Sequence, residues 1–191
     1  MDEGSSKELI SAAALELFAQ KGFESVGVNE IAEKAKLAKP SLYHHFGSKN
    51  GLLKAIIETE GAPLAALTSR NAVYQHNIVM NLRMLFNESL DFAKEKPEFF
   101  RLLLRLFASA ADAPGYAEGI VLREKIIAEY RRLFLNAVED HGNMRGREML
   151  YAETFWALIA SCALLEINGG YHFDDAGRFR IVHQYMHGIF S

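Results

Sequence analysis

The sequence predicts an all-α protein of about nine helices, and three observations carry this prediction. Apolar residues recur every three or four positions through most of the 191 residues, which is the spacing of an amphipathic helix. No stretch alternates apolar and polar residues with the period of two that a half-buried strand requires. Short breaks with glycine, proline or asparagine separate the helical segments. We therefore expect helices packed on helices, without a sheet.

Four helices are expected in the N-terminal part of the chain, over residues 6–20, 28–35 and 39–46 and from residue 49 onward. Pro40 falls in the first turn of the third helix, where proline is tolerated because the N–H it lacks would be unpaired anyway. Gly47 ends that helix, and Ser48 can cap the fourth. Gly61-Ala62-Pro63 is expected to end or kink the fourth helix. Two short helices joined by a tight turn and braced by a longer helix form a helix-turn-helix arrangement.

The remainder of the chain also reads as helices. They are expected over residues 73–94, 97–110, 116–140, 147–167 and 174–189. We place the domain boundary just before the Gly-Ala-Pro break, so that residues 1–55 form a helix-turn-helix domain and residues 56–191 form a larger helical domain.

The composition excludes several classes of protein. The chain contains one cysteine, which rules out a disulfide framework and a multi-cysteine zinc site and suits a reducing cytoplasm. The longest nearly unbroken apolar run covers 11 residues, 155–165, and is shorter than a bilayer requires, so we expect no membrane-spanning helix. The acidic N-terminus lacks the basic and apolar regions of a secretory signal. We expect a cytoplasmic protein with no membrane partner.

The net charge of −3 argues against a nucleic-acid partner only when the whole chain is averaged. Residues 1–55 contain seven lysines and seven acidic residues, so this segment is neutral. Within it, residues 34–57 contain five lysines and no aspartate or glutamate. This acid-free window, which we call the lysine window, covers the third predicted helix. A solvated lysine face would be the simpler interpretation if the window held lysines alone.

Residues of the window and of the segment before it match a known pattern. Gly22-Phe23, Val28, Ile31-Ala32, Ala35 and the run Ser41-Leu42-Tyr43-His44-His45-Phe46, followed by Ser48-Lys49 and Leu52, resemble the DNA-binding domain of the tetracycline-repressor (TetR) family. The fixed spacing of aromatic, cap and lysine makes this pattern more specific than a general helix-turn-helix. The resemblance covers about residues 22–53 and implies a DNA-binding transcriptional regulator.

Six residues are implied to meet DNA. By the resemblance, Tyr43 and Lys49 contact phosphates, and Lys39, Pro40, Ser41 and His44 lie on the groove-facing side of the recognition helix. Physical chemistry agrees with this division, because a tyrosine hydroxyl and a lysine near a helix start can position the backbone of DNA, whereas Lys39 can reach a guanine edge.

Three positions depart from the family pattern. Gly27 stands where the family usually has a threonine or serine that caps the second helix and touches phosphate. Lys36 stands where the turn usually has glycine, so it must adopt a left-handed conformation or reshape the turn. Gly51 replaces a residue that is often acidic, and we expect it to weaken the start of the fourth helix and make it more pliable.

The C-terminal domain of the family usually dimerises and binds a small effector. Aromatic residues on the predicted helices are candidates to line a cavity for an apolar or aromatic effector, although packing of an ordinary core explains each of them equally well. These are Phe86, Phe99, Phe107, Tyr130, Phe134, Phe155 and Trp156. Polar candidates to orient such a ligand are His76, Asn77, Arg83 and Arg105.

The predicted helix over residues 147–167 is apolar on two faces, so it should meet both its own core and something else. With the last helix and the same pair from a second chain it would form a four-helix bundle, the alternative being an interior helix of a monomer. The expected dimer residues are Ala160, Ala163, Leu164, Phe179, Val182 and Met186.

We therefore expect a homodimeric regulator, a repressor that binds a palindromic operator and is released by an effector. No cofactor is expected. His183 and His187 are four residues apart, but without a third ligand they read as surface or interface histidines and not as a metal site. Cys162 reads as inert packing. The rivals are an all-α enzyme, for which no catalytic constellation is recognisable, and a helical adaptor that contacts protein instead of DNA.

Overall fold

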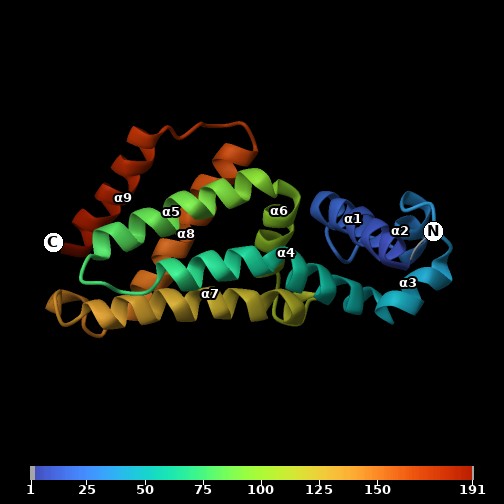
Figure 1. The fold of residues 1–191 in the computed structure, drawn as a ribbon, viewed down its shortest axis with the longest axis horizontal. Helices are drawn as coiled ribbons and strands as arrows, with labels where there is room; N and C mark the ends of the chain where they lie inside the picture. The colour runs from blue at the N-terminus through green and yellow to red at the C-terminus, as the bar shows by residue number, and fades with distance from the viewer. Residues whose placement is uncertain (1–2, 191) are drawn as a thin grey trace. The chain divides into compact units, whose positions relative to one another are not determined.

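The computed structural model describes residues 3–190 and confirms the all-α prediction. Over those residues it contains nine α-helices, one 3-10 turn and no strand (Figure 1). The helices are α1 (Glu3–Lys21), α2 (Val28–Lys34), α3 (Lys39–Phe46), α4 (Lys49–Asn71), α5 (Ile78–Glu95), α6 (Pro97–Phe107), α7 (Tyr116–Ala137), α8 (Glu148–Ile167) and α9 (Asp175–Phe190), and the 3-10 turn η1 covers Gly142–Met144.

The chain divides into two compact units, and neither is one continuous segment. Unit 1 comprises the residues up to Ala62 together with Pro97–Arg123, so it adds α6 and the start of α7 to the predicted helix-turn-helix. Unit 2 comprises Pro63–Lys96 and the residues from Glu124 onward. Helix α4 runs without interruption across residues 55 and 56. Where the DNA-binding and effector-binding parts divide functionally stays a prediction.

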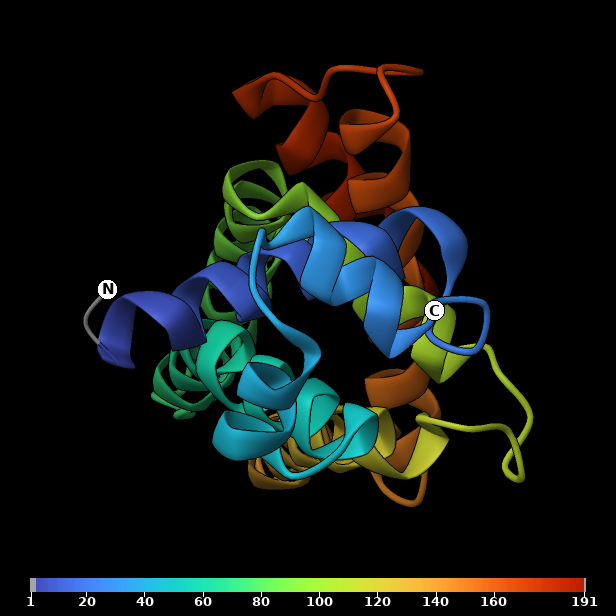
Figure 2. The same ribbon diagram turned by 90° about the vertical axis from the view of Figure 1, so that its right-hand side faces the viewer.

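In unit 1, apolar residues of α1, α2 and α3 make a small core. Figure 2 looks onto α1, α2 and α3, drawn in blue to cyan. Phe18 of α1, Ile31 of α2 and Leu42 of α3 are at most 1% exposed, and the rings of Phe18 and Phe23 meet edge to face with centroids 5.1 Å apart. Because Leu42 is the buried residue of α3, its anchoring turns the opposite side of that helix to solvent.

The turn between α2 and α3 contains Lys36 with φ of 55°, so the predicted left-handed conformation is the one adopted. Its backbone makes two capping bonds, from Lys36 N to Glu33 O (3.0 Å) and from Leu37 N to Ala32 O (3.0 Å). This pair of bonds is the usual left-handed helix end. A lysine in that conformation costs about 1 kcal/mol relative to glycine.

Helix α4 begins where the sequence predicts but ends later. It does not end at Pro63 but continues to Asn71, with the proline inside the helix. The next helix therefore begins at Ile78, not near residue 73, and Asn77 caps it by accepting from Met80 N (3.0 Å). At the start of α4, Ser48 Oγ accepts from Gly51 N (2.9 Å), as expected of a cap.

Gly51 has a steric role that the sequence did not indicate, whereas the pliability of the start of α4 stays a prediction. A Cβ added at this position would lie 2.1 Å from the carbonyl oxygen of Phe46, the last residue of α3. The absent side chain is therefore a condition of the tight corner between α3 and α4. The sequence shows a glycine shortly after the end of a helix. Only the structure shows that the Phe46 carbonyl oxygen lies so close that a side chain would not fit.

In unit 2, helix α5 packs against both α8 and α9. Its buried stripe includes Leu82, Phe86 and Ser89, each 0% exposed. Arg178 of α9 is almost buried and bonds to Asp91 of α5 (2.8 Å), with Glu166 of α8 at 3.6 Å. A charge at such a position requires partners. These contacts join three helices of the unit.

Replacing Gly51 by alanine should destabilise the protein by about 2 kcal/mol or more, because the added methyl group meets backbone and not a flexible side chain. The measurement is urea denaturation followed by circular dichroism. Gly27→Ala is the matched control, since no atom lies within 4 Å of a Cβ added there. Equal losses for the two variants would contradict the role given to Gly51.

Candidate functional site

The exposed side of α3 carries most of the predicted DNA-contacting residues. Lys39, Pro40 and His44 are exposed, Tyr43 is 45% exposed, and Ser41 is half-buried. Lys39 and Tyr43 are one turn apart, and the Lys39 ammonium lies 6.0 Å from the centre of the Tyr43 ring. The helix thus presents a cation, a phenol and an imidazole to solvent, a combination of donors that suits phosphates and base edges.

Ion pairs reduce the charge of the lysine window below the sequence count. Lys34 lies 2.8 Å from Glu16 of α1, and Lys54 lies 3.9 Å from Glu58 one turn along α4. Lys36 and Lys39 are exposed and flank the turn that leads into α3. The exposed positive charge of Lys36 and Lys39 is therefore concentrated at the start of α3.

Lys49 has a structural task that the sequence did not reveal. Its ammonium donates to the carbonyl oxygens of Phe23 (2.9 Å) and Val26 (3.1 Å) and lies 4.3 Å from the centre of the Phe23 ring. Burial lowers the pKa of this lysine, and the charge of Glu24 opposes that effect. Because an ammonium has three N–H groups, one remains for a further acceptor. Lys49 therefore holds the α1–α2 turn against the start of α4 and keeps one N–H group for a further acceptor.

The start of α4 is suited to an anion. No acidic residue lies in its first turn, and the amide groups of a helix start carry partial positive charge. The corresponding start of α2 is less well equipped, since Gly27 occupies the cap position and makes no side-chain hydrogen bond. The expected consequence of glycine at position 27, the loss of a hydroxyl at this point, is thus present in the structure.

The seven aromatic residues predicted to line a cavity fall into both units. Phe99, fully buried, and Phe107, half-buried, belong to unit 1. The other five belong to unit 2 and are at most 5% exposed: Phe86, Tyr130, Phe134, Phe155 and Trp156. The rings of Tyr130 and Phe155 meet edge to face with centroids 5.5 Å apart.

The polar residues suggested for orienting a ligand lie at the surface. His76, Asn77, Arg83 and Arg105 are all exposed. The buried polar residues of unit 2 are different ones, among them Thr68, Asn71 and Ser89. Their signal in the sequence is a polar residue at a helix position whose neighbours one turn away are apolar, as Ser89 is in the series of Leu82, Leu85 and Phe86.

The predicted dimer residues differ in how far their own chain buries them. Ala163, Val182 and Met186 are buried inside unit 2, Ala160 and Leu164 are half-buried, and Phe179 is 45% exposed. The apolar residues that α8 leaves in solvent form a separate row, which we call the outer face of α8. They are Met149, Leu150, Ala157 and Leu165, with Leu158 half-buried.

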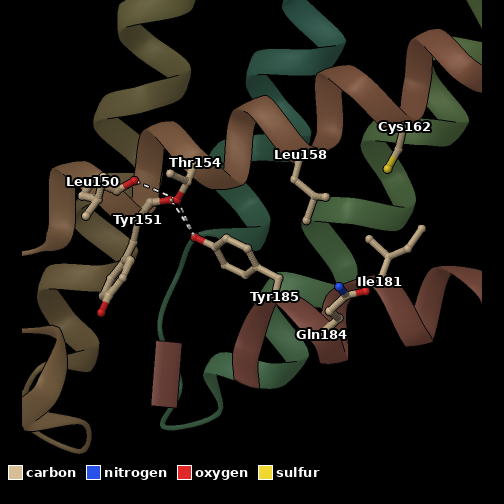
Figure 3. Close-up of a pocket in the computed structure, with 8 residues that line it drawn as sticks. All are labelled: Leu150, Tyr151, Thr154, Leu158, Cys162, Ile181, Gln184 and Tyr185. Atoms are coloured by element: carbon tan, nitrogen blue, oxygen red, sulfur yellow. Dashed lines mark hydrogen bonds between the residues drawn. The ribbon is translucent and has the colours of Figure 1, made fainter. Parts of the chain in front are cut away.

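A groove of about 510 Å³ runs between α8 and α9 beside this outer face (Figure 3). Tyr185 points across it and donates its hydroxyl to the carbonyl oxygen of Tyr151 (2.8 Å), near Thr154 Oγ1 (3.2 Å). The groove is lined by Leu150, Tyr151, Thr154, Leu158, Cys162, Ile181, Gln184 and Tyr185. Most of these surfaces are apolar, which is unusual for a surface that meets only water.

Helix α8 is also long and apolar enough to cross a membrane, which the count of unbroken apolar residues did not anticipate. Its most apolar 18-residue window has a mean hydropathy of 1.4, and 39% of that window is buried. A core helix of a water-soluble protein passes the same test, so this composition alone is weak evidence for a membrane. It does show that α8 has more apolar surface than its own chain covers.

The cysteine and the paired histidines do not form a reactive or metal-binding site in the described part of the chain. Cys162 is buried, and burial raises the pKa of its thiol, which makes it a poor nucleophile. His183 and His187 bring their Nε2 atoms within 3.0 Å. Among the described residues, however, no group of three or more histidine, cysteine or acidic side chains could hold a metal ion.

The fold and the exposed side of α3 define a helix-turn-helix protein, and the comparisons with known proteins agree. Residues 10–56 match the family described as "Bacterial regulatory proteins, tetR family". The match covers α2, α3 and most of α1, so the helix-turn-helix segment of this chain is similar to the DNA-binding segment of that family.

Two curated relatives match part of the chain. The HTH-type transcriptional activator FasR of Mycolicibacterium smegmatis is 29% identical over 102 residues, which cover 53% of this chain and 46% of that protein. The HTH-type transcriptional repressor BdcR of Escherichia coli is 44% identical over 63 residues, which cover 31% of this chain and 32% of that protein. The matched segment thus spans less than half the length of either relative.

A solved structure matches nearly the whole chain. The transcriptional regulator FadR from Bacillus subtilis, in complex with stearoyl-CoA, superimposes with a TM-score of 0.72 over 96% of this chain and 97% of that one. The sequence identity is 13%, so this likeness concerns the fold.

Replacing Lys49 by methionine should lower the stability by about 1–2 kcal/mol, because two hydrogen bonds and a cation–π contact are lost while the aliphatic stem is kept. Urea denaturation measures this. Lys39→Met, on the exposed side of α3, is the control and should change the stability by less than about 0.5 kcal/mol. A Lys49→Met protein as stable as Lys39→Met would show that the contacts do not hold the turn.

Proposed function

We propose that this protein is a homodimeric transcriptional regulator, a repressor, that binds a palindromic operator through α3 and is released by a small apolar or aromatic effector. The observation that carries the proposal is the exposed side of α3, with Lys39, Tyr43 and His44 in solvent above the buried anchor Leu42. In this proposal residues 1–55 provide DNA binding, and residues 56–191 provide effector binding and dimerisation. It is a protein without enzymatic activity, as its regulator relatives suggest, and it acts on DNA in the cytoplasm.

The roles at the DNA follow from the chemistry of each side chain. The Tyr43 hydroxyl and the third N–H of Lys49 hold phosphates, which positions the protein without reading sequence. Lys39, Ser41 and His44 face the major groove, where a lysine can reach guanine O6 or N7, and Pro40 shapes the start of the helix. The repressor assignment has support from the segment shared with BdcR, while the relative FasR is named an activator.

The outer face of α8 is the surface that supports a dimer. Leu150 is 60% exposed and Leu165 is 48% exposed on a helix whose other side is packed in the core. A second copy of the chain laid on this face would bury the outer face of α8 in each chain and fill the groove beside α9, giving a twofold interface of four helices. Two recognition helices are also what a palindromic operator requires, since half-sites are ~34–36 Å apart.

Release by an effector is a shift between two conformations of the dimer. An effector bound in unit 2 favours the conformation in which the two α3 helices do not fit successive major grooves. Helix α4 is a candidate to carry the change, since one continuous helix contains both Lys49 and the buried Thr68. A coupling of ~1–3 kcal/mol would change operator affinity about 5- to 150-fold. The apolar character of the effector is supported by the buried aromatic residues and by the stearoyl-CoA complex of the FadR neighbour.

Substitutions of Lys39 and Tyr43 should weaken DNA binding differently, one by changing its salt dependence and the other by lowering affinity alone. Lys39→Met should reduce the slope of log affinity against log salt by about 0.9, because one lysine–DNA charge contact is lost. Tyr43→Phe should lower affinity roughly fivefold on all DNA sequences and leave the slope unchanged, because the lost donor is neutral. Fluorescence anisotropy with DNA flanking the protein's own gene measures both.

Lys125→Met, an exposed lysine of α7, is the control for this experiment. A wild-type protein that shows no salt-dependent, sequence-selective binding contradicts the proposed function and favours the adaptor alternative.

The dimer should depend on the outer face of α8. Leu150→Glu together with Leu165→Glu should convert the dimer to a monomer, because two charges would be buried in an apolar interface without partners. Analytical ultracentrifugation gives the oligomeric state. Leu135→Glu is the matched control, since Leu135 of α7 is 55% exposed. A double variant that stays dimeric would place the interface elsewhere.

A further inference from the structure

The core of unit 2 contains polar atoms whose hydrogen-bonding capacity is unused. The hydroxyl groups of Tyr130 and Ser89 and the side-chain nitrogen of Asn71 are buried and have no hydrogen-bond partner in the described structure. Tyr130 and Ser89 are 0% exposed, and Asn71 is 7% exposed. Buried polar groups are nearly always paired, so each such exception requires an explanation, such as a bound water or a ligand.

These atoms come from three helices of the same unit. The hydroxyls of Ser89 (α5) and Thr68 (α4) lie close enough to the phenol of Tyr130 (α7) to lower its pKa, against the larger rise caused by burial, but neither forms a hydrogen bond of ordinary geometry with it. Thr68 donates its own hydroxyl proton to the carbonyl oxygen of Leu64 (2.8 Å). Asn71 lies one helical turn beyond Thr68 on α4. We call Tyr130, Ser89, Thr68 and Asn71 the hydroxyl cluster.

Aromatic residues surround the cluster on the same helices. Phe86 is three residues before Ser89 on α5, and Phe134 is four residues after Tyr130 on α7, so each pair shares a helix face. Phe155 of α8 meets the Tyr130 ring edge to face. All three phenylalanines are 0% exposed. A few convergent polar groups within an apolar lining are the usual composition of a small-molecule site.

The chemistry of the unused atoms indicates what they would hold. Burial raises the pKa of Tyr130, so its phenol stays protonated and can donate. The serine hydroxyl can also donate, and the amide nitrogen of Asn71 is a donor only. All three groups are neutral, and a carboxylate buried against neutral groups alone would be costly. The matching ligand group is therefore a neutral oxygen acceptor.

We propose that the hydroxyl cluster is the polar anchor of the effector site and binds the carbonyl oxygen of a neutral, aromatic or otherwise apolar ligand such as a ketone, ester or amide. This inference rests on the proposed function as an effector-responsive regulator. Tyr130 and Ser89 donate to the carbonyl oxygen, Asn71 supplies a further donor, and Phe86, Phe134 and Phe155 contact the apolar body.

The proposal also explains why an unfavourable arrangement is kept. Without ligand, the unused donors destabilise the core, since they have lost their bonds to water. A ligand that satisfies them stabilises only the conformation in which it is bound. Because the cluster is enclosed, admission of a ligand requires movement of α4, α5 or α7, and binding is thereby coupled to conformation.

The test uses benzophenone as the carbonyl probe and diphenylmethane, which lacks the oxygen, as its matched hydrocarbon. Isothermal titration of the full-length protein should show tighter binding of benzophenone. Tyr130→Phe and Ser89→Ala should each weaken benzophenone binding roughly fivefold and leave diphenylmethane binding unchanged. Tyr185→Phe is the control, since the Tyr185 hydroxyl bonds to Tyr151 O beside the α8–α9 groove.

Two further readouts exclude a purely structural role for the tyrosine. The carbonyl stretching band of bound benzophenone should lie at lower frequency in the wild-type protein than in Tyr130→Phe, because a hydrogen bond weakens the C=O bond. The thermal midpoint of unliganded Tyr130→Phe should equal or exceed that of the wild type, because an unpaired buried hydroxyl is removed. A tyrosine that served the fold would give a lower midpoint.

Several results would overturn the inference. These are equal binding of the two probes, absence of binding by benzophenone, a carbonyl band unaffected by Tyr130→Phe, or a crystal structure in which ordered water alone pairs the cluster. Ser89→Ala gives the same comparison if Tyr130→Phe does not fold. Operator binding of the unliganded protein is measured in parallel: its absence refutes the proposed function, whereas operator binding with no carbonyl selectivity refutes only the anchor.

Discussion

The corner between α3 and α4 is the constraint on which the proposed DNA-binding surface depends. Gly47 leaves α3 with φ of 72°, Ser48 caps α4, and the missing side chain of Gly51 admits the carbonyl oxygen of Phe46. Lys49, at the same corner, is tied to the carbonyl oxygens of Phe23 and Val26. Backbone contacts of this kind tolerate little displacement, so the corner fixes α3 relative to α1 and α2 and thereby decides which of its residues face solvent.

Lys49 illustrates how one residue can serve the fold and a ligand together. Two of its N–H groups are used by the turn, which orders the ammonium and keeps it partly dehydrated, as its lowered pKa reflects. A pre-ordered cation loses less conformational freedom when it meets a phosphate than a freely rotating lysine does. The family resemblance alone suggests a surface lysine, whereas the structure suggests a positioned one.

Unit 2 differs from Lys49, whose N–H groups the fold uses, because several buried hydrogen-bond donors in unit 2 have no partner. The charged groups Arg178 and Asp91 are paired, whereas neutral donors of Tyr130, Ser89 and Asn71 are not. The outer face of α8 is likewise apolar surface that its own chain does not cover. Unused donors inside and uncovered apolar residues outside are both consistent with the proposed function, in which the working protein includes a ligand and a second chain.

The sequence by itself determined the elements that depend on local rules. Helix periodicity and glycine breaks located nine helices, Ser48 was identifiable as a cap, and Lys36 was constrained to a left-handed turn or a reshaped one because turn geometry is local. The candidate residues of α3 came from the resemblance of its sequence pattern to the tetR family, and the structure exposes Lys39, Tyr43 and His44.

Only the tertiary structure decided the rest, because each remaining feature involves residues far apart in the chain. The continuation of α4 through Pro63, the approach of Phe46 to Gly51, the carbonyl partners of Lys49 and the meeting of Thr68, Ser89 and Tyr130 all depend on packing between segments. Sequence periodicity records which face of a helix is apolar, but not which other helix covers it or which of its polar atoms is left without a partner.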